Sequence, residues 1–257
     1  MDFSFGQWLL AVAGALMVGL AKTGLPGLGI LCVVVFASIL PAKESSGFIL
    51  PMLIFADSVA VAAYWRHTQW RHLLRLFPWT GAGVLVGWWA MERISDAQAQ
   101  VMIGGIVLAL LGMQLWRRWR EKEARVTSMK VGGEEIALPG IWFAPLLGVL
   151  AGFTTLVSNA AGPLMSIYLL AMGMPKMKFI GTAAVFFFLL NCFKVPFMVN
   201  LGLITTGSFS FNLLLAPAVL TGALLGRWLL PRINQRVFEA LVLGLSALAG
   251  LRLLLGV

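Results

Sequence analysis

Charged residues are scarce in this chain, and their scarcity excludes most classes of protein. Only 11% of the 257 residues are Asp, Glu, Lys or Arg, whereas 60% are hydrophobic. Soluble domains carry roughly 25% charged residues, so a water-soluble globular fold is excluded. The many aliphatic and aromatic residues exclude disorder as well. The remaining class is an integral membrane protein with most of its length in hydrocarbon.

Cysteine and histidine are rare too, with two residues of each. Two cysteines cannot form a disulfide framework, and Cys32 and Cys192 lie in apolar runs, which is typical of small buried hydrophobic residues. His67 and His72 lack the third ligand that a zinc site needs. The chain has no phosphate-binding loop and no dinucleotide fingerprint. We therefore expect no metal, no cofactor, no catalytic residue and no ATP-driven transport.

Apolar runs of spanning length occur six times, and two further apolar stretches are too long for one helix. The long stretches, 6–40 and 136–175, are interrupted by small and helix-breaking residues, GLAKTGLPGLG at 19–29 and VSNAAGP at 157–163. Each stretch is expected to form two helical arms joined by a break, either as a re-entrant hairpin or as two short spans. The six single runs are 47–65, 76–91, 97–116, 179–199, 208–226 and 237–256.

The distribution of basic residues distinguishes two topologies. If each broken stretch returns to the side where it began, 14 Lys and Arg face the cytoplasm and three face outward. If the second broken stretch crosses the membrane once, the numbers become ten and seven. Because cytoplasmic loops carry the excess of Lys and Arg, the first topology is favoured. The same rule explains the net charge of +9 better than nucleic-acid binding does, since the basic residues form no stripe.

The favoured topology predicts two inverted repeats, because each half then has one broken pair and three full spans. Two motif pairs support a repeat: GVLVGWW at 83–89 matches GALLGRW at 222–228, and LPAKESSG at 40–47 matches MPKMKFIG at 174–181. The offsets are 139 and 134 residues. The predicted fold is an all-α polytopic membrane protein with a first repeat over 1–116, a cytoplasmic linker over 117–135 and a second repeat over 136–257.

Inverted repeats with broken helices are typical of secondary transporters, whose substrate site lies near the membrane midplane where the breaks meet. Helix ends in a membrane are tolerated where they line a cavity, and helix N-termini suit an anion. The alternative is that the glycines of the breaks only allow helices to pack closely, which is what we expect of the GxxxG pairs at 83/87 and 222/226. The candidate substrate-binding residues are Lys22, Thr23, Gly24, Gly27, Ser158, Asn159, Gly162, Asn191 and Lys194.

Three ionisable residues lie well inside the predicted spans: Lys22, Asp57 and Lys194. Each costs at least about 2.5–3.5 kcal/mol there, so each needs a partner or an aqueous cavity. Lys194 is the first candidate for neutralising an anion, and the alternatives are a structural ion pair with Asp57 or snorkelling. Asp57 is the candidate for proton coupling, against a purely structural ion pair or hydrogen bond. At the offset of 134, Asp57 aligns with Asn191.

The segments GLAKTGLPGLG, LPAKESSGFILPMLIFAD and YWRHTQWRHLLRLFP resemble the first half of the sulfite exporter TauE/SafE family. GFTTLVSNAAGPLMSIYLLAMGMPKMKFIGTAAVFFFLLNCFKVPF resembles its second half. The resemblance implies a bacterial inner-membrane permease that moves small sulfur-containing or organic anions, such as sulfite and organosulfonates, generally outward. The residues that match the glycine-rich breaks and the Asn-x-x-Lys segment of the family are Lys22, Gly24, Pro26, Ser158, Asn159, Gly162, Asn191 and Lys194.

Two other functions remain open from the residues alone. One is a passive anion channel, and the other is a membrane-embedded enzyme that uses the basic loop at 66–75. The expected partners are a small anion and membrane lipid, with a proton or sodium as the coupling ion and no nucleic acid. The sequence leaves the identity of the anion and a homodimer open.

Overall fold

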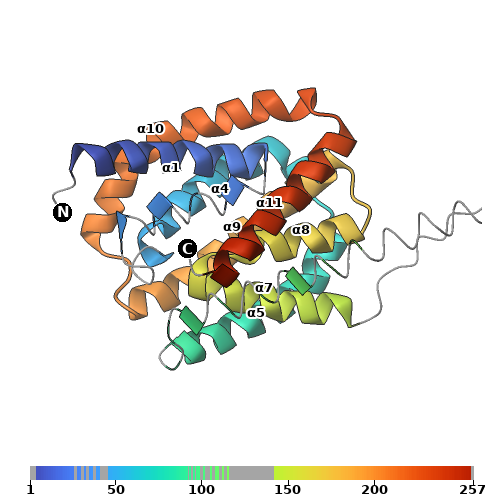
Figure 1. Cartoon of the computed structure of the whole chain (residues 1–257), viewed down its shortest axis with the longest axis horizontal. Coiled ribbons are helices and arrows are strands. Elements are labelled where there is room, and N and C mark those ends of the chain that lie inside the picture. The colour runs from blue at the N-terminus through green and yellow to red at the C-terminus, as the bar shows by residue number, and fades with distance from the viewer. Residues whose placement is uncertain are drawn as a thin grey trace, which may run out of the picture.

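The computed structural model of the chain is a bundle of helices (Figure 1). It describes residues 4–25, 46–91 and 142–255, together with 28–29, 32, 35–36, 39–40, 93, 95, 97–98, 101, 105, 108–109, 112 and 115. No strand occurs among these residues, so the predicted all-α class is confirmed. The elements are α1 (Phe5–Thr23), α4 (Leu50–Tyr64), η2 (Trp65–His67), α5 (Trp70–Met91), α7 (Phe143–Ser158), α8 (Ala161–Ala171), α9 (Lys176–Asn200), α10 (Thr206–Leu229), η3 (Leu230–Arg232) and α11 (Gln235–Leu255).

Four helical stretches of the described chain are long and apolar enough to cross a membrane: Phe5–Thr23, Ser46–His67, Lys176–Asn200 and Thr206–Arg232. Three of the predicted spans, 47–65, 179–199 and 208–226, lie within them. The predicted runs 76–91 and 237–256 correspond to α5 and α11. Most of the run 97–116 and the whole predicted linker 117–135 lie outside the described residues.

Both predicted helix breaks coincide with helix ends. Helix α1 ends at Thr23, inside the predicted break at 19–29. Helix α7 ends at Ser158, Asn159 adopts a left-handed conformation with φ of 53°, and α8 begins at Ala161. Asparagine is one of the few non-glycine residues that adopt this conformation readily, and it ends a helix there.

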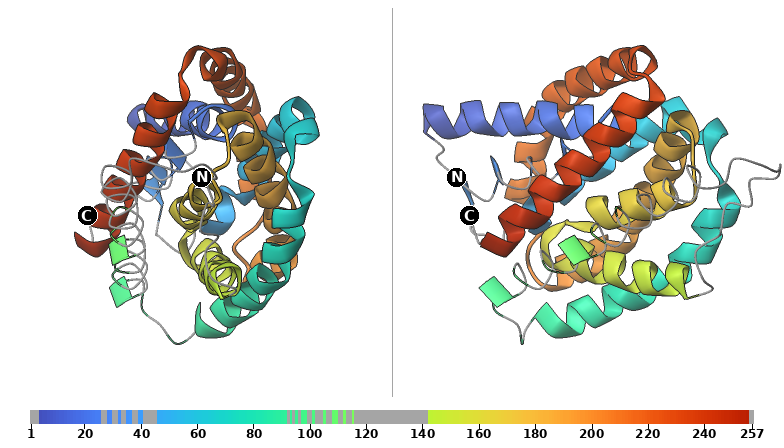
Figure 2. Two further views of the ribbon diagram at one scale, coloured as in Figure 1. Left: turned by 90° about the vertical axis from the view of Figure 1, so that its right-hand side faces the viewer. Right: turned by 45° about the vertical axis from the view of Figure 1, so that its right-hand side comes forward.

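Helices α7 and α8 form an antiparallel hairpin around their break (Figure 1). The rings of Phe143, at the start of α7, and Tyr168, near the end of α8, are stacked with their centroids 6.1 Å apart. Ten of the eleven residues of α8 are buried, and Figure 2 shows α8 in the interior, next to α7 and α11. A helix that is apolar on all sides is expected to be buried in this way.

Helices α1 and α10 lie side by side and parallel (Figure 1). Their backbones touch at glycines: a Cβ added to Gly222 would lie 2.0 Å from the carbonyl oxygen of Leu16. A Cβ added to Gly19 would lie equally close, 2.0 Å, to the carbonyl oxygen of Val219. Neither position can carry a larger residue unless the helices separate.

Helices α5 and α7 form a second parallel pair of the same kind. A Cβ added to Gly83 would lie 2.1 Å from the carbonyl oxygen of Val149, and one added to Gly152 would lie 2.0 Å from that of Thr80. The prediction that the glycines at 83 and 222 mediate close helix packing is therefore confirmed.

Helices α4 and α9 cross as an antiparallel pair in the centre of the bundle. The chain just before α4, at Gly47, meets Leu203 beyond the end of α9, whereas Gly181, near the start of α9, meets the carbonyl of Tyr64 at the end of α4. Hydrogen bonds fix the second end, since the Thr68 hydroxyl donates to the Gly181 carbonyl over 3.1 Å. The middle of this pair carries Asp57 and Asn191.

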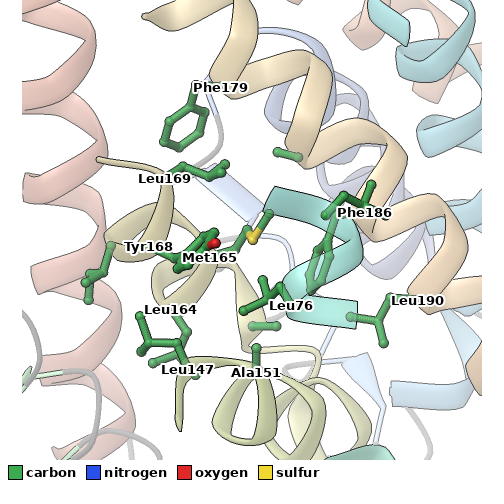
Figure 3. Packing of buried hydrophobic residues seen from close by; sticks show 14 of the residues in the cluster. Leu76, Leu147, Ala151, Leu164, Met165, Tyr168, Leu169, Phe179, Phe186 and Leu190 are labelled. Carbon is green, nitrogen blue, oxygen red and sulfur yellow. The ribbon is translucent and has the colours of Figure 1, made fainter. Parts of the chain in front are cut away.

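The apolar interior is divided between two clusters. The larger cluster joins α5, α7, α8 and α9, and Figure 3 shows Leu147, Leu164, Tyr168 and Phe186 packed within it. The smaller cluster joins α1, α4 and α10. Large apolar side chains are also exposed on the outside, as expected of a surface that faces lipid.

The glycine contacts predict a large difference between two Gly→Ala variants. Gly222→Ala places a methyl group against the Leu16 backbone and should cost about 1–3 kcal/mol or more of unfolding free energy. Gly244→Ala is the matched control, because nothing lies within 4 Å of its added Cβ, and the higher helix propensity of alanine should stabilise α11 by up to about 1 kcal/mol. Thermal unfolding of the purified proteins in detergent measures both effects. Equal stability of the two variants would contradict the close contact of α1 with α10.

Candidate functional site

A cavity of about 80 Å³ lies between the two helix breaks. By the same measure a water molecule needs about 10–15 Å³, so the cavity has room for on the order of five water-sized groups. The lining is mostly apolar and includes the polar side chains of Lys22, Thr155, Asn159 and Asn191. The lining residues are Ala21, Lys22, Gly29, Cys32, Ile49, Leu53, Thr155, Asn159, Ala160, Gly162, Pro163, Ile180, Ala183, Ala184, Phe187 and Asn191.

Lys22, which lines the cavity, forms an ion pair with Asp57. The Lys22 Nζ atom is 2.8 Å from Asp57 Oδ1, and the Asn191 side-chain amide donates a hydrogen bond to Asp57 Oδ2 over 2.7 Å. The Asp57 side chain is 0% exposed, whereas that of Lys22 is 16% exposed and lines the cavity. The Lys22 ammonium also lies 4.4 Å from the ring centroid of Phe187. Lys22 and Asn191 thus both connect the buried carboxylate to the cavity, and Lys22 is the charged one of the two.

Lys194 is buried and is not among the residues that line the cavity. Its ammonium donates hydrogen bonds to Asn159 Oδ1 over 2.5 Å and to the Thr155 hydroxyl over 3.3 Å. Both acceptors are neutral, and no carboxylate of the described chain lies within ion-pair distance of Lys194. In the structure Asp57 therefore pairs with Lys22 and not with Lys194, which is the alternative expected from the sequence.

The side chain of Asn159 connects the second break to the start of the α4 region. Its amide nitrogen donates to the carbonyl oxygen and the hydroxyl of Ser46, over 3.0 and 3.2 Å. Its amide oxygen accepts from Lys194. Both ends of the side chain are therefore occupied, and Asn159 holds Lys194 in place.

The N-terminus of α8 points its first turn at the cavity. Ala160, Gly162 and Pro163 line the cavity, and no side chain caps the helix. The first N–H groups of a helix have no partner within it, and they carry the positive end of its dipole. A Cβ added to Gly162 would have nothing within 4 Å, so the space above this turn is open.

The structure brings some of the predicted residues together and leaves others apart. Lys22, Asn159, Gly162 and Asn191 all line the cavity, and Lys194, which does not, donates a hydrogen bond to Asn159.

Two predicted residues serve helix packing in this structure. The Thr23 hydroxyl donates to the Ala223 carbonyl of α10 over 2.7 Å, and Gly24 touches Gly226. Gly27 and the side chain of Ser158 lie outside what the structure describes.

Sequence reasoning missed the contributions of Thr155 and Phe187. Phe187 precedes Asn191 by four residues on α9, so the two share a helix face. Thr155 lies in the last turn of α7, four residues before Asn159. This spacing could have indicated both residues. Cys32, which also lines the cavity, had no signal beyond its place in an apolar run.

These features define the chain as a polytopic, all-helical membrane protein with a small cavity between two helix breaks. Residues 10–253 match the family model described as Sulfite exporter TauE/SafE. Because the match covers nearly the whole chain, the chain belongs to this family of membrane transporters, and the resemblance seen in the sequence is confirmed. Neither a comparison with curated proteins nor one with solved structures gave a match.

Substitution of Lys22 tests whether the ion pair is formed. Lys22→Gln leaves Asp57 buried without a counter-charge, which should cost about 3–5 kcal/mol of unfolding free energy. The double variant Lys22→Gln/Asp57→Asn removes both charges, so most of the loss should be recovered. Denaturation in detergent at pH 7.5 compares the two proteins. If the double variant were no more stable than the single one, the ion pair would not be the interaction that neutralises Asp57.

Proposed function

We propose that the chain is a secondary transporter of small sulfur-containing or organic anions, such as sulfite or organosulfonates, in the bacterial inner membrane. The anion binds between the two breaks near the midplane, and alternating access carries it across, with export as the net direction. The observation that carries this proposal is the cavity itself, whose lining combines Lys22 with the uncapped N-terminus of α8.

The charge of this centre supports an anion as the substrate. When all three groups are ionised, Lys22 and Lys194 contribute two positive charges and Asp57 one negative charge, which gives one net positive charge. Only Lys22 reaches the cavity directly, and Lys194 acts through Asn159. Because a charge interacts more strongly in a low-dielectric interior than in water, a buried net positive charge favours a bound anion.

Residue equivalences support two inverted repeats, with the first over 1–116, the linker over 117–135 and the second over 136–257. The contact of Gly83 with Val149 corresponds to that of Gly222 with Leu16, at offsets of 139 and 133 residues.

A second pair of contacts repeats this relation. The contact of Thr80 with Gly152 corresponds to that of Val219 with Gly19, at the same two offsets. The α1–α10 interface therefore repeats the α5–α7 interface, as expected when two related halves each pack their first helix on the other half.

The helix directions also agree with the favoured topology. In that topology α1 and α10 both run inward, α5 and α7 both start at the cytoplasmic face, and α4 and α9 run in opposite directions. From the contacts, α1 runs parallel to α10, α5 runs parallel to α7, and α4 runs antiparallel to α9. Had the second broken stretch crossed the membrane, α10 would oppose α1. The antiparallel α7–α8 hairpin is what a re-entrant segment requires.

A pair of aromatic and basic residues recurs at the offset of 139. The Arg93 guanidinium lies 4.1 Å from the ring centroid of Trp89, and that of Arg232 lies 3.8 Å from the ring centroid of Trp228. Tryptophan and arginine are typical of the membrane–water interface. In inverted repeats the two pairs mark opposite faces of the membrane.

Anion flux in proteoliposomes tests the proposed function. The wild-type protein should show counterflow of sulfite or of an organosulfonate, which a passive channel does not show. Lys194→Ala should abolish flux while the protein still inserts, because the centre loses its net positive charge. Lys178→Ala is the matched control on the same helix, since Lys178 is exposed at the start of α9. Near-normal flux in Lys194→Ala would remove Lys194 from the site.

Cysteine labelling tests the inverted topology at two equivalent positions. The Ser95 hydroxyl accepts from the Gln98 N–H group, and the Asn234 side chain accepts from that of Val237, again at an offset of 139. In a protein without Cys32 and Cys192, Ser95→Cys should react with a membrane-impermeant maleimide added to spheroplasts, and Asn234→Cys only after lysis. Labelling of both from the same side would contradict inverted repeats.

A further inference from the structure

We propose that the transported anion and Asp57 compete for Lys22, and that the Asp57 carboxylate takes up a proton when the anion displaces it. The proposal deepens the proposed transport function and rests on it. Its consequence is that one proton binds with each anion and crosses the membrane in the same direction, so net export occurs when the outward anion gradient exceeds any inward proton gradient.

The argument begins with the position of Lys22. Its ammonium lines the cavity, and the same ammonium is the group that pairs with Asp57 Oδ1. Asp57 is 0% exposed and does not line the cavity, so an anion in the cavity meets Lys22 and not the carboxylate. An anion that draws Lys22 toward itself therefore weakens or breaks the ion pair behind it.

No other basic side chain touches Asp57 among the described residues. Helix α9 provides the neutral amide of Asn191, and Lys194 on the same helix acts through its field while it bonds Asn159 and Thr155. Cys192, next to Asn191, is exposed on the outside.

The other elements packed against α4 bring no charge to Asp57. Helix α10 contributes apolar side chains and the neutral amide of Asn212, which donates to the Phe48 carbonyl. The charge of Arg227, near the end of α10, reaches Tyr64 at the end of α4 and not Asp57. At the end of α4, the Tyr64 hydroxyl donates to the Thr23 carbonyl, and Arg66 and His67 lie beyond it in η2. Lys22 is thus the counter-ion of Asp57, and Asp57 loses its neutralising charge when Lys22 moves away.

A proton can take the position that Lys22 leaves. Asp57 Oδ2 already accepts from the Asn191 amide, while Oδ1 has no hydrogen-bond partner besides the Lys22 ion pair. Protonation at Oδ1 therefore keeps the bond to Asn191 and removes the uncompensated buried charge, which would otherwise be strongly unfavourable. The atoms balance: Lys22 stays an ammonium, the anion gains its pairing, and Asp57 becomes a neutral carboxylic acid.

The charge of the centre explains a ratio of one proton to one monoanion. When all three groups are ionised, Lys22, Lys194 and Asp57 carry one net positive charge. When a monoanion and a proton bind together, the total is unchanged. A monoanion alone would leave the centre neutral with a buried, unpaired carboxylate, which is the state that the proton relieves.

Anion binding to the purified wild-type protein between pH 5.5 and 8.5 provides the first test. Ethanesulfonate is the probe, because it stays ionised throughout and its own protonation cannot contribute. One linked proton predicts that its dissociation constant rises about tenfold per pH unit once the anion-free protein has lost that proton. Asp57→Asn, a permanent mimic of the protonated acid, should bind with no pH dependence. Glu239→Gln, a carboxylate-to-amide change on α11, should keep the wild-type slope.

Transport by proteoliposomes provides the second test. With acid outside, the wild-type protein should accumulate ethanesulfonate against its gradient, whereas Asp57→Asn should exchange it without accumulation. The proposal is overturned if wild-type affinity does not change with pH, or if Asp57→Asn still couples accumulation to the pH gradient. Should Asp57→Asn not fold, the wild-type slope alone decides. Failure of the proposed function has another signature, namely that the wild-type protein neither binds nor exchanges any of the anions.

Discussion

The backbone of α1 touches that of α10, and the backbone of α5 touches that of α7. The location of the cavity depends on these two contacts. Gly19 lies four residues before the end of α1, and Gly152 lies six residues before the end of α7. Helices that meet at glycines are held at the shortest possible separation. The two helix ends are therefore held beside the central α4–α9 pair, and the cavity forms between them.

The helix ends at the cavity carry polar groups whose hydrogen-bonding needs lipid could not satisfy. The N–H groups at the start of α8 and the ammonium of Lys22 require polar partners, and the cavity is where such partners can enter. The two lysines differ in their surroundings. Lys22 pairs with a carboxylate and lines the cavity, whereas Lys194 donates to neutral acceptors and does not line the cavity. The centre thus holds two basic side chains and one acidic side chain, in a chain that belongs to a sulfite exporter family.

The candidate site could be predicted in part because its residues stand out locally. Lys22, Asn159 and Gly162 lie in breaks that interrupt long apolar stretches, and all three line the cavity. Thr23 and Gly24 lie in the same break as Lys22, yet they pack against α10, because adjacent residues on a helix point in different directions. Which face of α1 meets α10 depends on the crossing of two helices about 200 residues apart in sequence.

The sequence by itself determined the membrane class, the all-helical fold and the positions of both breaks, since apolar runs, glycines and prolines act within one turn or one span. Only the tertiary structure decided which cation neutralises Asp57. Lys22 and Lys194 are both possible from the sequence, and the choice depends on distances set by helix packing. Burial makes that choice energetically important, because in a low-dielectric interior the nearer of two charges interacts more strongly with the carboxylate.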